Sequence, residues 1–301
     1  NKQKIIGKRM VVLAIVNMNV YQMYRKMTRI VTSLVVVSCT EVRTIEVHEH
    51  QKVATVQDVF ARVQTVPIAL PSPSFAMGNA KLVDEKPVHA VVLTQPFESM
   101  KTEVTQELYM AVMDENPSFF QQCGLDCPVE KVRWLDVIHF SNRLNDVLGL
   151  EQCYVAGIHG HVEWSNGLDC SGWRLPTEAE WEWMAHPTHT KRHLLLNEVA
   201  WFKGNSNHRT HPVCQKEANA HQLCDILGNV QEWVWDVVDS YPAEEVTDPL
   251  GGVDGSHHIF RGGAWNRYSE NVVSTKRKDG SYLFRNNDLG FRMVRSILVD
   301  E

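Results

Sequence analysis

The sequence predicts an α+β fold, because helical patterns are few, strand patterns are short and scattered, and long stretches show no periodicity. The clearest helix runs from residue 134 to residue 148, where apolar residues recur at helical spacing before Gly149. Residues 186–219 and 240–258 form two long irregular stretches. Loops of this length in a compact domain are usually functional or are stabilised by bound ions or disulfides. With 301 residues and 44% hydrophobic content, the chain can bury a full core as one large or two small domains.

Residues 1–38 are interpreted as an upstream extension followed by a bacterial lipoprotein signal. A basic flank precedes an apolar run, and Val36-Val-Ser-Cys39 places Cys39 at the lipidation position. The alternative is a short buried strand that ends in an ordinary cysteine. Because the sequence opens on Asn1, the residues before Met27 are read as an extension of the reading frame. This interpretation predicts an exported, membrane-anchored lipoprotein, periplasmic or on the cell surface, held only by a lipid at Cys39.

The next segment sets the expected domain boundary. A short helix is possible near residues 56–63, and Pro67, Pro71 and Pro73 then form a stiff spacer, since proline neither continues a helix nor donates to a sheet. We therefore expect residues 39–73 to be a linker and residues 74–298 to form one domain.

Two strands and a helix are expected at the start of that domain. Residues 88–93 are rich in β-formers, and residues 97–104 are expected to form a strand that leads to Thr105. Thr105 is a suitable N-cap for a helix that ends at Met113.

Seven cysteines favour an oxidising compartment. One pair lies in a Cys-Gly-Leu-Asp-Cys loop, and a second flanks two short strand patterns that read as a hairpin, residues 153–155 and 161–164. Two disulfides are predicted, Cys123–Cys127 and Cys153–Cys170. A zinc site at the first pair is the weaker interpretation, because its CxxxC spacing has no clear second ligand pair. The pairing of Cys214 with Cys224 stays open.

Charge and hydropathy exclude two classes of partner. The net charge of −6 is spread without long basic blocks, so the electrostatic footprint of a nucleic-acid binder is missing. The apolar runs near the amino terminus are shorter than the roughly 20 residues that span a bilayer. We expect no nucleic-acid partner, and a membrane contact only through the lipid anchor.

The stretch Ser171–Ala185 is the centre of the sequence pattern. In Arg-Leu-Pro-Thr-Glu-Ala-Glu-Trp-Glu-Trp, Thr177 and Glu180 have the spacing of a capping box, which predicts a helix that starts at Glu178. Trp181 and Met184 recur at helical spacing and give this helix a large apolar face.

Three later motifs follow this helix in a fixed order: Gly-Asn-Val-Gln-Glu-Trp from residue 228, Arg-Gly-Gly-Ala-Trp from residue 261, and Gly-Phe-Arg from residue 290. In this combination the chain resembles the formylglycine-generating enzyme (sulfatase-modifying factor) family, from Phe75 to Ser296. The resemblance implies the C-type-lectin-like fold of that family.

The same resemblance bears on activity. Formylglycine-generating enzymes use two cysteines after the Arg-Gly-Gly motif to hold copper and the thiol substrate, and here those positions are Arg267 and Val272. Neither residue forms a thiolate or binds Cu(I). Iron is not expected either, because the helical domain with iron-binding histidines found in the related sulfoxide synthases is missing. We therefore lean towards a binding protein that is not an enzyme, with a metal-dependent oxidoreductase of unknown substrate as the alternative.

Calcium is the cofactor that the resemblance implies. The family holds an ion near Gly-Asn-Val-x-Glu-Trp with side-chain and carbonyl oxygens, and the matching residues are Asp225, Gly228, Val230 and Glu232. Such an oxygen-rich loop suits a hard cation. The alternative is that both carboxylates only cap a turn or pair with a neighbouring cation.

The resemblance also implies a ligand-binding surface near the carboxyl end, over the substrate site of the enzymes. A mixture of Tyr, Trp, Asn and Arg suits adaptable recognition. The residues expected on it are Trp265, Asn266, Arg267, Tyr268, Asn271, Lys276, Arg277, Tyr282 and Arg285. The ligand, a protein or a small molecule, stays open. The same region is diversified in retroelement-linked variable proteins, which is a subordinate hypothesis here.

Overall fold

The computed structural model describes residues 35–38, 41–44, 54–157, 160–186, 195–252 and 255–298. The chain separates into two units, residues 1–53 and 54–301, and each is described by itself. In the first unit, β1 (Val35–Ser38) and β2 (Glu41–Thr44) pair antiparallel. Cys39 and most of the expected signal lie outside the described residues. Over the part of the chain that is described, no helix is long and apolar enough to cross a membrane.

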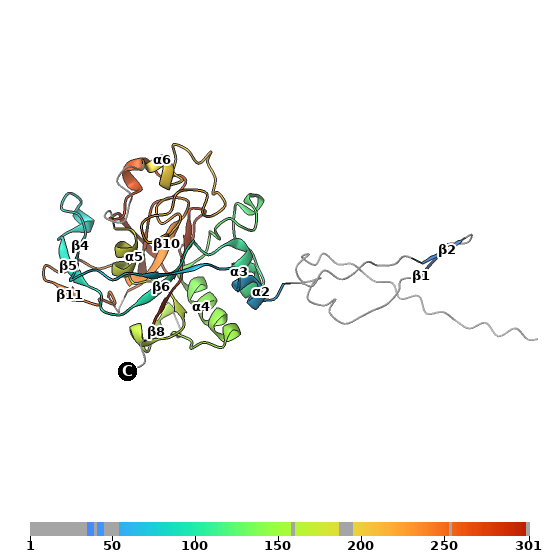
Figure 1. Cartoon of the computed structure of the whole chain (residues 1–301), viewed down its shortest axis with the longest axis horizontal. Coiled ribbons are helices and arrows are strands. Elements are labelled where there is room, and N and C mark those ends of the chain that lie inside the picture. The colour runs from blue at the N-terminus through green and yellow to red at the C-terminus, as the bar shows by residue number, and fades with distance from the viewer. Residues whose placement is uncertain are drawn as a thin grey trace, which may run out of the picture. The chain divides into compact units, whose positions relative to one another are not determined.

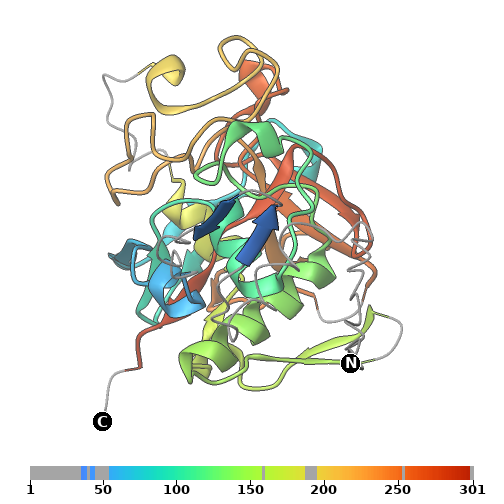
Figure 2. The same ribbon diagram turned by 90° about the vertical axis from the view of Figure 1, so that its right-hand side faces the viewer.

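Among its described residues the second unit has few helices, and the longest has 15 residues. The α-helices are α2 (Val56–Phe60), α3 (Gln106–Met113), α4 (Trp134–Leu148), α5 (Glu178–Met184) and α6 (Leu196–Val199). Single 3₁₀ turns are η1 (Val83–Glu85), η2 (Gln121–Cys123), η4 (Gly167–Asp169) and η6 (Ser269–Asn271). Figures 1 and 2 both place α6 on one side of this unit and α4 on the opposite side, with the sheets between them.

Three sheets and one hairpin make up the β part of this unit. The first sheet has the order β13-β12-β10-β14, with β10 (Gln231–Val237), β12 (His257–Arg261), β13 (Arg277–Ser281) and β14 (Leu289–Phe291). The second is β11-β5-β4, with β4 (Phe75–Met77), β5 (His89–Val92) and β11 (Val246–Thr247). The third is β3-β6-β15-β9, with β3 (Thr65–Ile68), β6 (Phe97–Met100), β9 (Trp173–Arg174) and β15 (Val294–Ser296). The hairpin joins β7 (Tyr154–Ala156) to β8 (Val162–Trp164). The α+β fold predicted from the sequence is confirmed.

The three helices with strong sequence signals form as predicted. Thr105 caps α3 by accepting a hydrogen bond from the Leu108 backbone, and α4 has the predicted bounds and ends at Gly149, which is left-handed. The capping box of α5 is complete: the Thr177 hydroxyl accepts from the Glu180 backbone, and the Glu180 carboxylate accepts from the Thr177 backbone. Local chemistry is sufficient to define these elements.

The expected boundary at residue 74 is wrong, because the segment before it belongs to the domain. Strand β3 pairs antiparallel with β6, so the proline-rich stretch contributes a sheet edge and only its end is free of regular structure. Val59 of α2 is buried in the main core. Pro67 is compatible with this strand because β3 is at the edge of its sheet, where a missing N–H is tolerated.

The central strand β10 was not predicted, although it contains the Gln-Glu-Trp of the second motif. Six of its seven residues are buried, so it shows none of the alternation that marks a strand with one face in water. On its two sides lie two apolar clusters. One is built around α4 and includes Trp134 and Trp233, and the other is built around Trp181 of α5. Strand β10 thereby places the predicted calcium segment and the Arg-Gly-Gly turn at the centre of the unit.

Candidate functional site

The Arg261-Gly-Gly turn fixes the start of the predicted binding surface. Arg261, at the end of β12, is 1% exposed and donates hydrogen bonds to Glu178 at 2.6 Å and to Glu182, which ties β12 to α5. Gly262 and Gly263 both have positive φ, and a Cβ at Gly263 would lie 2.9 Å from the Asn271 carbonyl oxygen. Only glycine fits this close approach without strain, so the turn directs the chain into the loop 264–272.

Three consecutive residues of that loop, Trp265, Asn266 and Arg267, form hydrogen bonds with the segment before β14. The Trp265 indole donates to the Asn287 carbonyl at 3.0 Å. Asn266 and Arg267 both donate to Oδ2 of Asp288, at 2.9 and 2.8 Å. Asp288 is fully buried, while Arg267 keeps 39% of its side chain exposed. The surface is therefore held by a buried carboxylate that sequence periodicity did not identify.

An aromatic row extends from this loop to the segment before η2. Trp265 meets Phe120 edge to face at 5.2 Å, and Phe120 meets Phe119 in the same way at 4.9 Å. Phe119 is 62% exposed and Tyr268 is 58% exposed, with the Lys203 ammonium 3.9 Å from the Tyr268 ring. These rings give the surface exposed apolar area with polar groups beside it, a composition typical of recognition sites.

Glu130 is a second buried acid that the sequence analysis missed. Burial raises the pKa of Glu130 to about 7, against the opposing effect of hydrogen bonds from the Phe120 and Phe119 backbones and of Lys131. Its Oε1 accepts from Phe120 at 2.7 Å, and its Oε2 has no hydrogen-bond partner among the described residues. Oδ1 of Asp288 is likewise unsatisfied within the described chain. No local pattern predicts this, because the partners of Glu130 come from 10 residues away along an irregular loop.

Four of the nine predicted surface residues have no observed contact with the loop 264–272. Arg277 is only 8% exposed and points inward to Glu178 at 2.7 Å, so its placement on the surface is wrong. The burial of Arg277 is compensated by its ion pair with the buried Glu178 carboxylate. Lys276 lies 3.6 Å from buried Glu85, and Tyr282 borders a small cavity next to the β7–β8 hairpin. Arg285 is exposed. We use the term loop surface for the five residues that follow the Arg-Gly-Gly turn: Trp265, Asn266, Arg267, Tyr268 and Asn271.

The two positions that carry thiols in formylglycine-generating enzymes are filled by residues with structural contacts. Arg267 is ion-paired with Asp288. Val272 is 1% exposed, and its side chain lies against Gly263. Each cysteine among the described residues is in a disulfide. The three bonds are Cys123–Cys127, Cys153–Cys170 and Cys214–Cys224. Both predicted pairings are present, and the open pair is joined as well.

Two of the four predicted calcium residues, Glu232 and Asp225, lie near the buried Arg292. Glu232 receives two hydrogen bonds from Arg292, at 2.8 and 3.2 Å, on Oε1, and its Oε2 accepts from the Trp181 indole at 2.7 Å. This pairing is the arrangement expected of a structural turn, and it counts against Glu232 as an ion ligand. Asp225 differs: its Oδ2 accepts from the Cys214 backbone at 2.6 Å, while its buried Oδ1 has no hydrogen-bond partner in the described chain.

Negative charge is in excess around Arg292. Glu103, Asp225 and Glu232 are each at most 2% exposed and share this one guanidinium. Burial, with Asp225 and Glu232 nearby, raises the pKa of Glu103 well above its usual range, and burial raises the pKa of Asp225 to about 6. Among the described residues, no group of three or more His, Cys, Asp or Glu side chains has an arrangement that could hold a metal. The predicted set has only two such side chains, with two carbonyls, so calcium at this place stays a prediction.

The architecture and the loop surface together define an α+β domain of the formylglycine-generating type. Residues 56–297 match the family described as sulfatase-modifying factor enzyme 1-like domain, and the chain belongs to this family.

Three proteins illustrate what the chain is similar to. The chaperone protein LppX of Paenibacillus barcinonensis is 30% identical over 237 residues, which are 65% of this chain and 79% of LppX. The formylglycine-generating enzyme of Streptomyces coelicolor is 29% identical over 286 residues, with 75% of this chain and 87% of the enzyme covered. The structure of Treponema denticola variable protein 1 superimposes with a TM-score of 0.70 at 32% identity, covering 77% of this chain and 94% of that protein.

Proposed function

We propose that this protein is a binding module on a formylglycine-generating-type scaffold, that it lacks formylglycine-generating activity, and that it recognises its ligand through the loop surface. The observation that carries the proposal is the filling of both thiol positions. Arg267 is engaged by Asp288, and Val272 is buried behind the turn. Oxidation of a client cysteine needs a thiolate that binds Cu(I), and neither side chain supplies one.

The names of two similar proteins support a binding role. One is called a variable protein and the other a chaperone, and each aligns over most of its own length. The loop surface also has suitable chemistry, because exposed aromatic rings and an arginine are the residues that contribute most at recognition sites. A more specific form of this proposal is that a retroelement diversifies the loop surface. Comparison of variant sequences from the same locus would test it.

The catalytic part of the proposal is tested with purified protein, a peptide that contains Cys-x-Pro-x-Arg, and copper. We expect no conversion of the peptide cysteine to an aldehyde, measured by mass spectrometry. Formation of the aldehyde would refute the proposal. The alternative function, a metal-dependent oxidoreductase, draws on one oxygen of Glu130 and one of Asp288 that have no hydrogen-bond partner among the described residues; Asp288 is also the ion-pair partner of Arg267. Stoichiometric copper or iron in elemental analysis of the purified protein would favour that alternative.

The binding part is tested with a pair of variants. Tyr268→Ser alters the exposed ring of the loop surface, and Lys278→Ser alters an exposed residue on β13 as its matched control. Both changes are at exposed positions, so both variants should keep the melting temperature of the parent. We expect any partner retained by the parent protein to be lost from Tyr268→Ser and kept by Lys278→Ser. Equal retention by the two variants would remove the loop surface from consideration.

We also propose that the protein is exported and anchored by a lipid on Cys39. Three disulfides support export, since such bonds persist in oxidising compartments. Mass spectrometry of membrane-extracted protein is expected to show a lipid-modified amino terminus at Cys39. Cys39→Ser should release the protein from the membrane fraction. An unmodified chain that retains residues 27–38 would contradict the anchor.

We retain calcium as a proposed structural ion. The excess of carboxylate around Arg292 and the free Oδ1 of Asp225 support it, together with the carbonyls of Gly228 and Val230. Glu232 contributes charge to this environment, although its oxygens are already hydrogen-bonded. The melting temperature with calcium and with a chelator is the direct test.

A further inference from the structure

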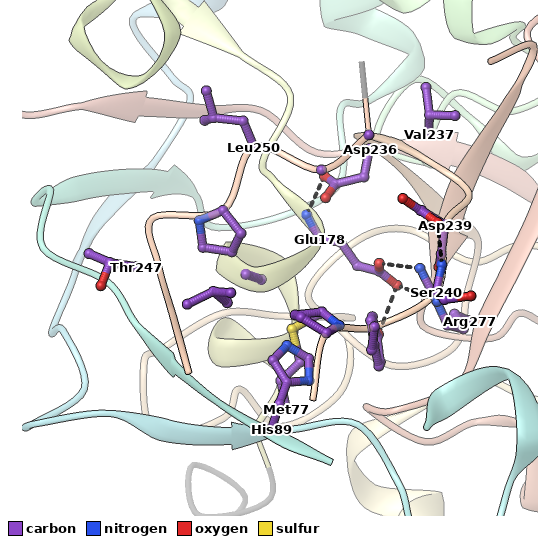
Figure 3. Close-up of a pocket in the computed structure, with 17 residues that line it drawn as sticks. Met77, His89, Glu178, Asp236, Val237, Asp239, Ser240, Thr247, Leu250 and Arg277 are labelled. Carbon is purple, nitrogen blue, oxygen red and sulfur yellow. Dashed lines mark hydrogen bonds and ion pairs between the residues drawn. The ribbon is translucent and has the colours of Figure 1, made fainter. Parts of the chain in front are cut away.

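A cavity that shares only Arg277 with the nine predicted surface residues lies between the start of α5, the end of β10 and the segment that contains β11. Its volume is about 410 Å³, within the ~300–1,000 Å³ typical of small-molecule sites. Figure 3 shows Met77 and His89 at one end of the lining and Asp236 at the other. Tyr241, Pro249 and Leu250 add apolar wall. The cavity is thus a small, largely apolar space with acidic groups in one wall.

The guanidiniums beside this cavity are already matched. Glu178 accepts from Arg261 at 2.6 Å and from Arg277 at 2.7 and 2.9 Å, and Arg261 also binds Glu182. The remaining Arg277 nitrogen donates to the backbone carbonyls of Asp84 and Asp239 at 3.2 and 2.8 Å. Two carboxylates therefore balance two guanidiniums. Nε of Arg261 has no hydrogen-bond partner among the described residues, but Arg261 does not line the cavity, and each nitrogen of Arg277, which does, is already hydrogen-bonded.

Asp236 is the carboxyl group that this balance omits. It is 6% exposed, and its Oδ2 accepts from the Glu178 backbone at 2.6 Å, as the dashed line in Figure 3 shows. Among the described residues no lysine or arginine forms an ion pair with it. Burial, and then the Glu178 carboxylate, raise the pKa of Asp236 to about 8, against the weaker opposing effects of the hydrogen bond from the Glu178 backbone and of Arg277. The other titratable groups in the lining are His89, Asp239 and Tyr241.

We propose that this cavity is a second ligand site, and that it binds a small organic cation, an ammonium group on an apolar body, with Asp236 as its counter-ion. An ammonium group would be the cationic partner that the Asp236 carboxylate does not have within the protein. The side chains of Pro249, Leu250 and Tyr241 would pack against the apolar body of the ligand. An anionic ligand would meet Glu178, Asp236 and Asp239 without a free guanidinium. Exposed Asp239 at the cavity adds attraction for a cation.

The charge preference is tested with three probes of one shape: phenethylammonium, the neutral 2-phenylethanol, and the anionic phenylacetate. Binding to the full chain is measured by calorimetry at pH 8. We expect phenethylammonium to bind at least about tenfold more tightly than 2-phenylethanol, since one desolvated charge pair exceeds the ~1.4 kcal/mol that tenfold represents. Phenylacetate should bind weakest. Equal binding of the three probes, binding of none, or preference for phenylacetate would overturn the proposal.

The counter-ion is tested with Asp236→Asn. The amide oxygen of Asn can still accept from the Glu178 backbone, so the start of α5 keeps its partner. We expect this variant to lose at least about tenfold in affinity for phenethylammonium and to bind 2-phenylethanol as the parent does. Asp279→Asn is the matched control, because Asp279 is a carboxylate on β13 that does not line this cavity. Unchanged affinity of Asp236→Asn for phenethylammonium would overturn the proposal.

A proton-linked signature separates this site from a surface ion pair. Below pH 8 the cation has to displace the Asp236 proton, so the affinity of the parent protein should rise by up to tenfold per unit between pH 6 and pH 8. Calorimetry in buffers of different ionisation enthalpy should show release of close to one proton per cation bound. In Asp236→Asn the pH dependence should disappear. An affinity independent of pH in the parent protein would contradict the assignment of Asp236, even if the three probes rank as expected.

Discussion

Two buried ionic clusters meet near the start of strand β10, where Arg261 of one pairs in register with Glu232 of the other, and they differ in charge balance. In the balanced cluster, Glu178 and Glu182 face Arg261 and Arg277, and each of the four carboxylate oxygens accepts at least one hydrogen bond. The acidic cluster is made of Glu103, Asp225, Glu232 and Arg292. There, three carboxylates share one guanidinium, and one oxygen of Asp225 has no partner in the described chain.

We interpret the balanced cluster as structural and the acidic cluster as the proposed ion site. Buried charges are tolerated when partners and hydrogen bonds compensate their desolvation, which the balanced cluster achieves within the protein alone. In the acidic cluster three carboxylates share one guanidinium. Burial raises the pKa values of Glu103 and Asp225, as it does that of Glu182 in the balanced cluster. Protonation of Glu103 or Asp225 relieves this excess of charge, and so would the proposed calcium ion. The balanced cluster should therefore respond mainly to mutation, and the acidic cluster to ions and pH.

The largest effect is expected from breaking the balanced cluster with Arg261→Met. This change leaves Glu182 buried without its guanidinium and removes one of the two guanidinium partners of Glu178, which should cost about 3–5 kcal/mol of unfolding free energy. Urea denaturation measures it. Arg295→Met is the matched control, because the Arg295–Glu98 pair is partly exposed and should be worth at most about 1 kcal/mol. Similar losses in the two variants would show that burial does not distinguish these pairs.

The start of helix α5 could be predicted from the sequence, but the ion pairs of the balanced cluster could not. Thr177 and Glu180 are three residues apart, so local hydrogen bonding predicts α5. Arg277 lies 99 residues from its partner Glu178, and no periodicity reports such a contact. It was consequently placed on the surface. The same reasoning applies to Asp288, whose contacts with Asn266 and Arg267 span a loop of about twenty residues.

The turn at Arg261-Gly-Gly shows what a family resemblance adds to local patterns. The resemblance identified Arg267 and Val272 as the former thiol positions from sequence alone, and the structure explains their contacts. The resemblance could not decide whether the Glu232 carboxylate binds an ion or pairs with an arginine, because that depends on the position of Arg292, 60 residues away in the sequence. Strand β10 was missed for a different reason: a strand buried on both faces carries no alternation.

The second prediction tests the acidic cluster with calcium. If calcium binds at Asp225, calcium at one hundred times its dissociation constant should stabilise the fold by about 2.7 kcal/mol, and a chelator should remove this gain. Magnesium should replace it poorly, because it demands a tighter octahedral geometry. Differential scanning calorimetry with each ion gives the shift in melting temperature. A melting temperature that is the same in calcium and chelator would leave the segment as a structural turn only.

The smallest effect concerns the charge of Asp225 itself, and its sign distinguishes the two clusters. Folding raises the pKa of Asp225 from an ordinary 3.8 to about 6, so the folded state holds a proton that the unfolded state has lost. The stability this group contributes is complete below about pH 4 and is lost as the pH rises through about 6. In chelator, the parent protein should therefore lose stability between pH 4 and pH 8. We expect Asp225→Asn to lose about 1–2 kcal/mol less over this interval, after allowing for relaxation around the charge.

Asp225→Asn preserves the backbone conformation and the hydrogen bond at this position, so it changes mainly the charge. Asp225 has a φ of 53°, a left-handed conformation in which Asn is well tolerated, and the amide oxygen can accept from the Cys214 backbone. In chelator at pH 8, Asp225→Asn should thus be more stable than the parent protein. In calcium the order should reverse, because the variant has lost the side chain that binds the ion. Glu182→Gln is the counterpart in the balanced cluster and should destabilise the protein in both media, since it leaves Arg261 with one partner fewer. If Asp225→Asn also destabilises the protein in chelator, the acidic cluster carries no excess charge, and the contrast between the two clusters fails.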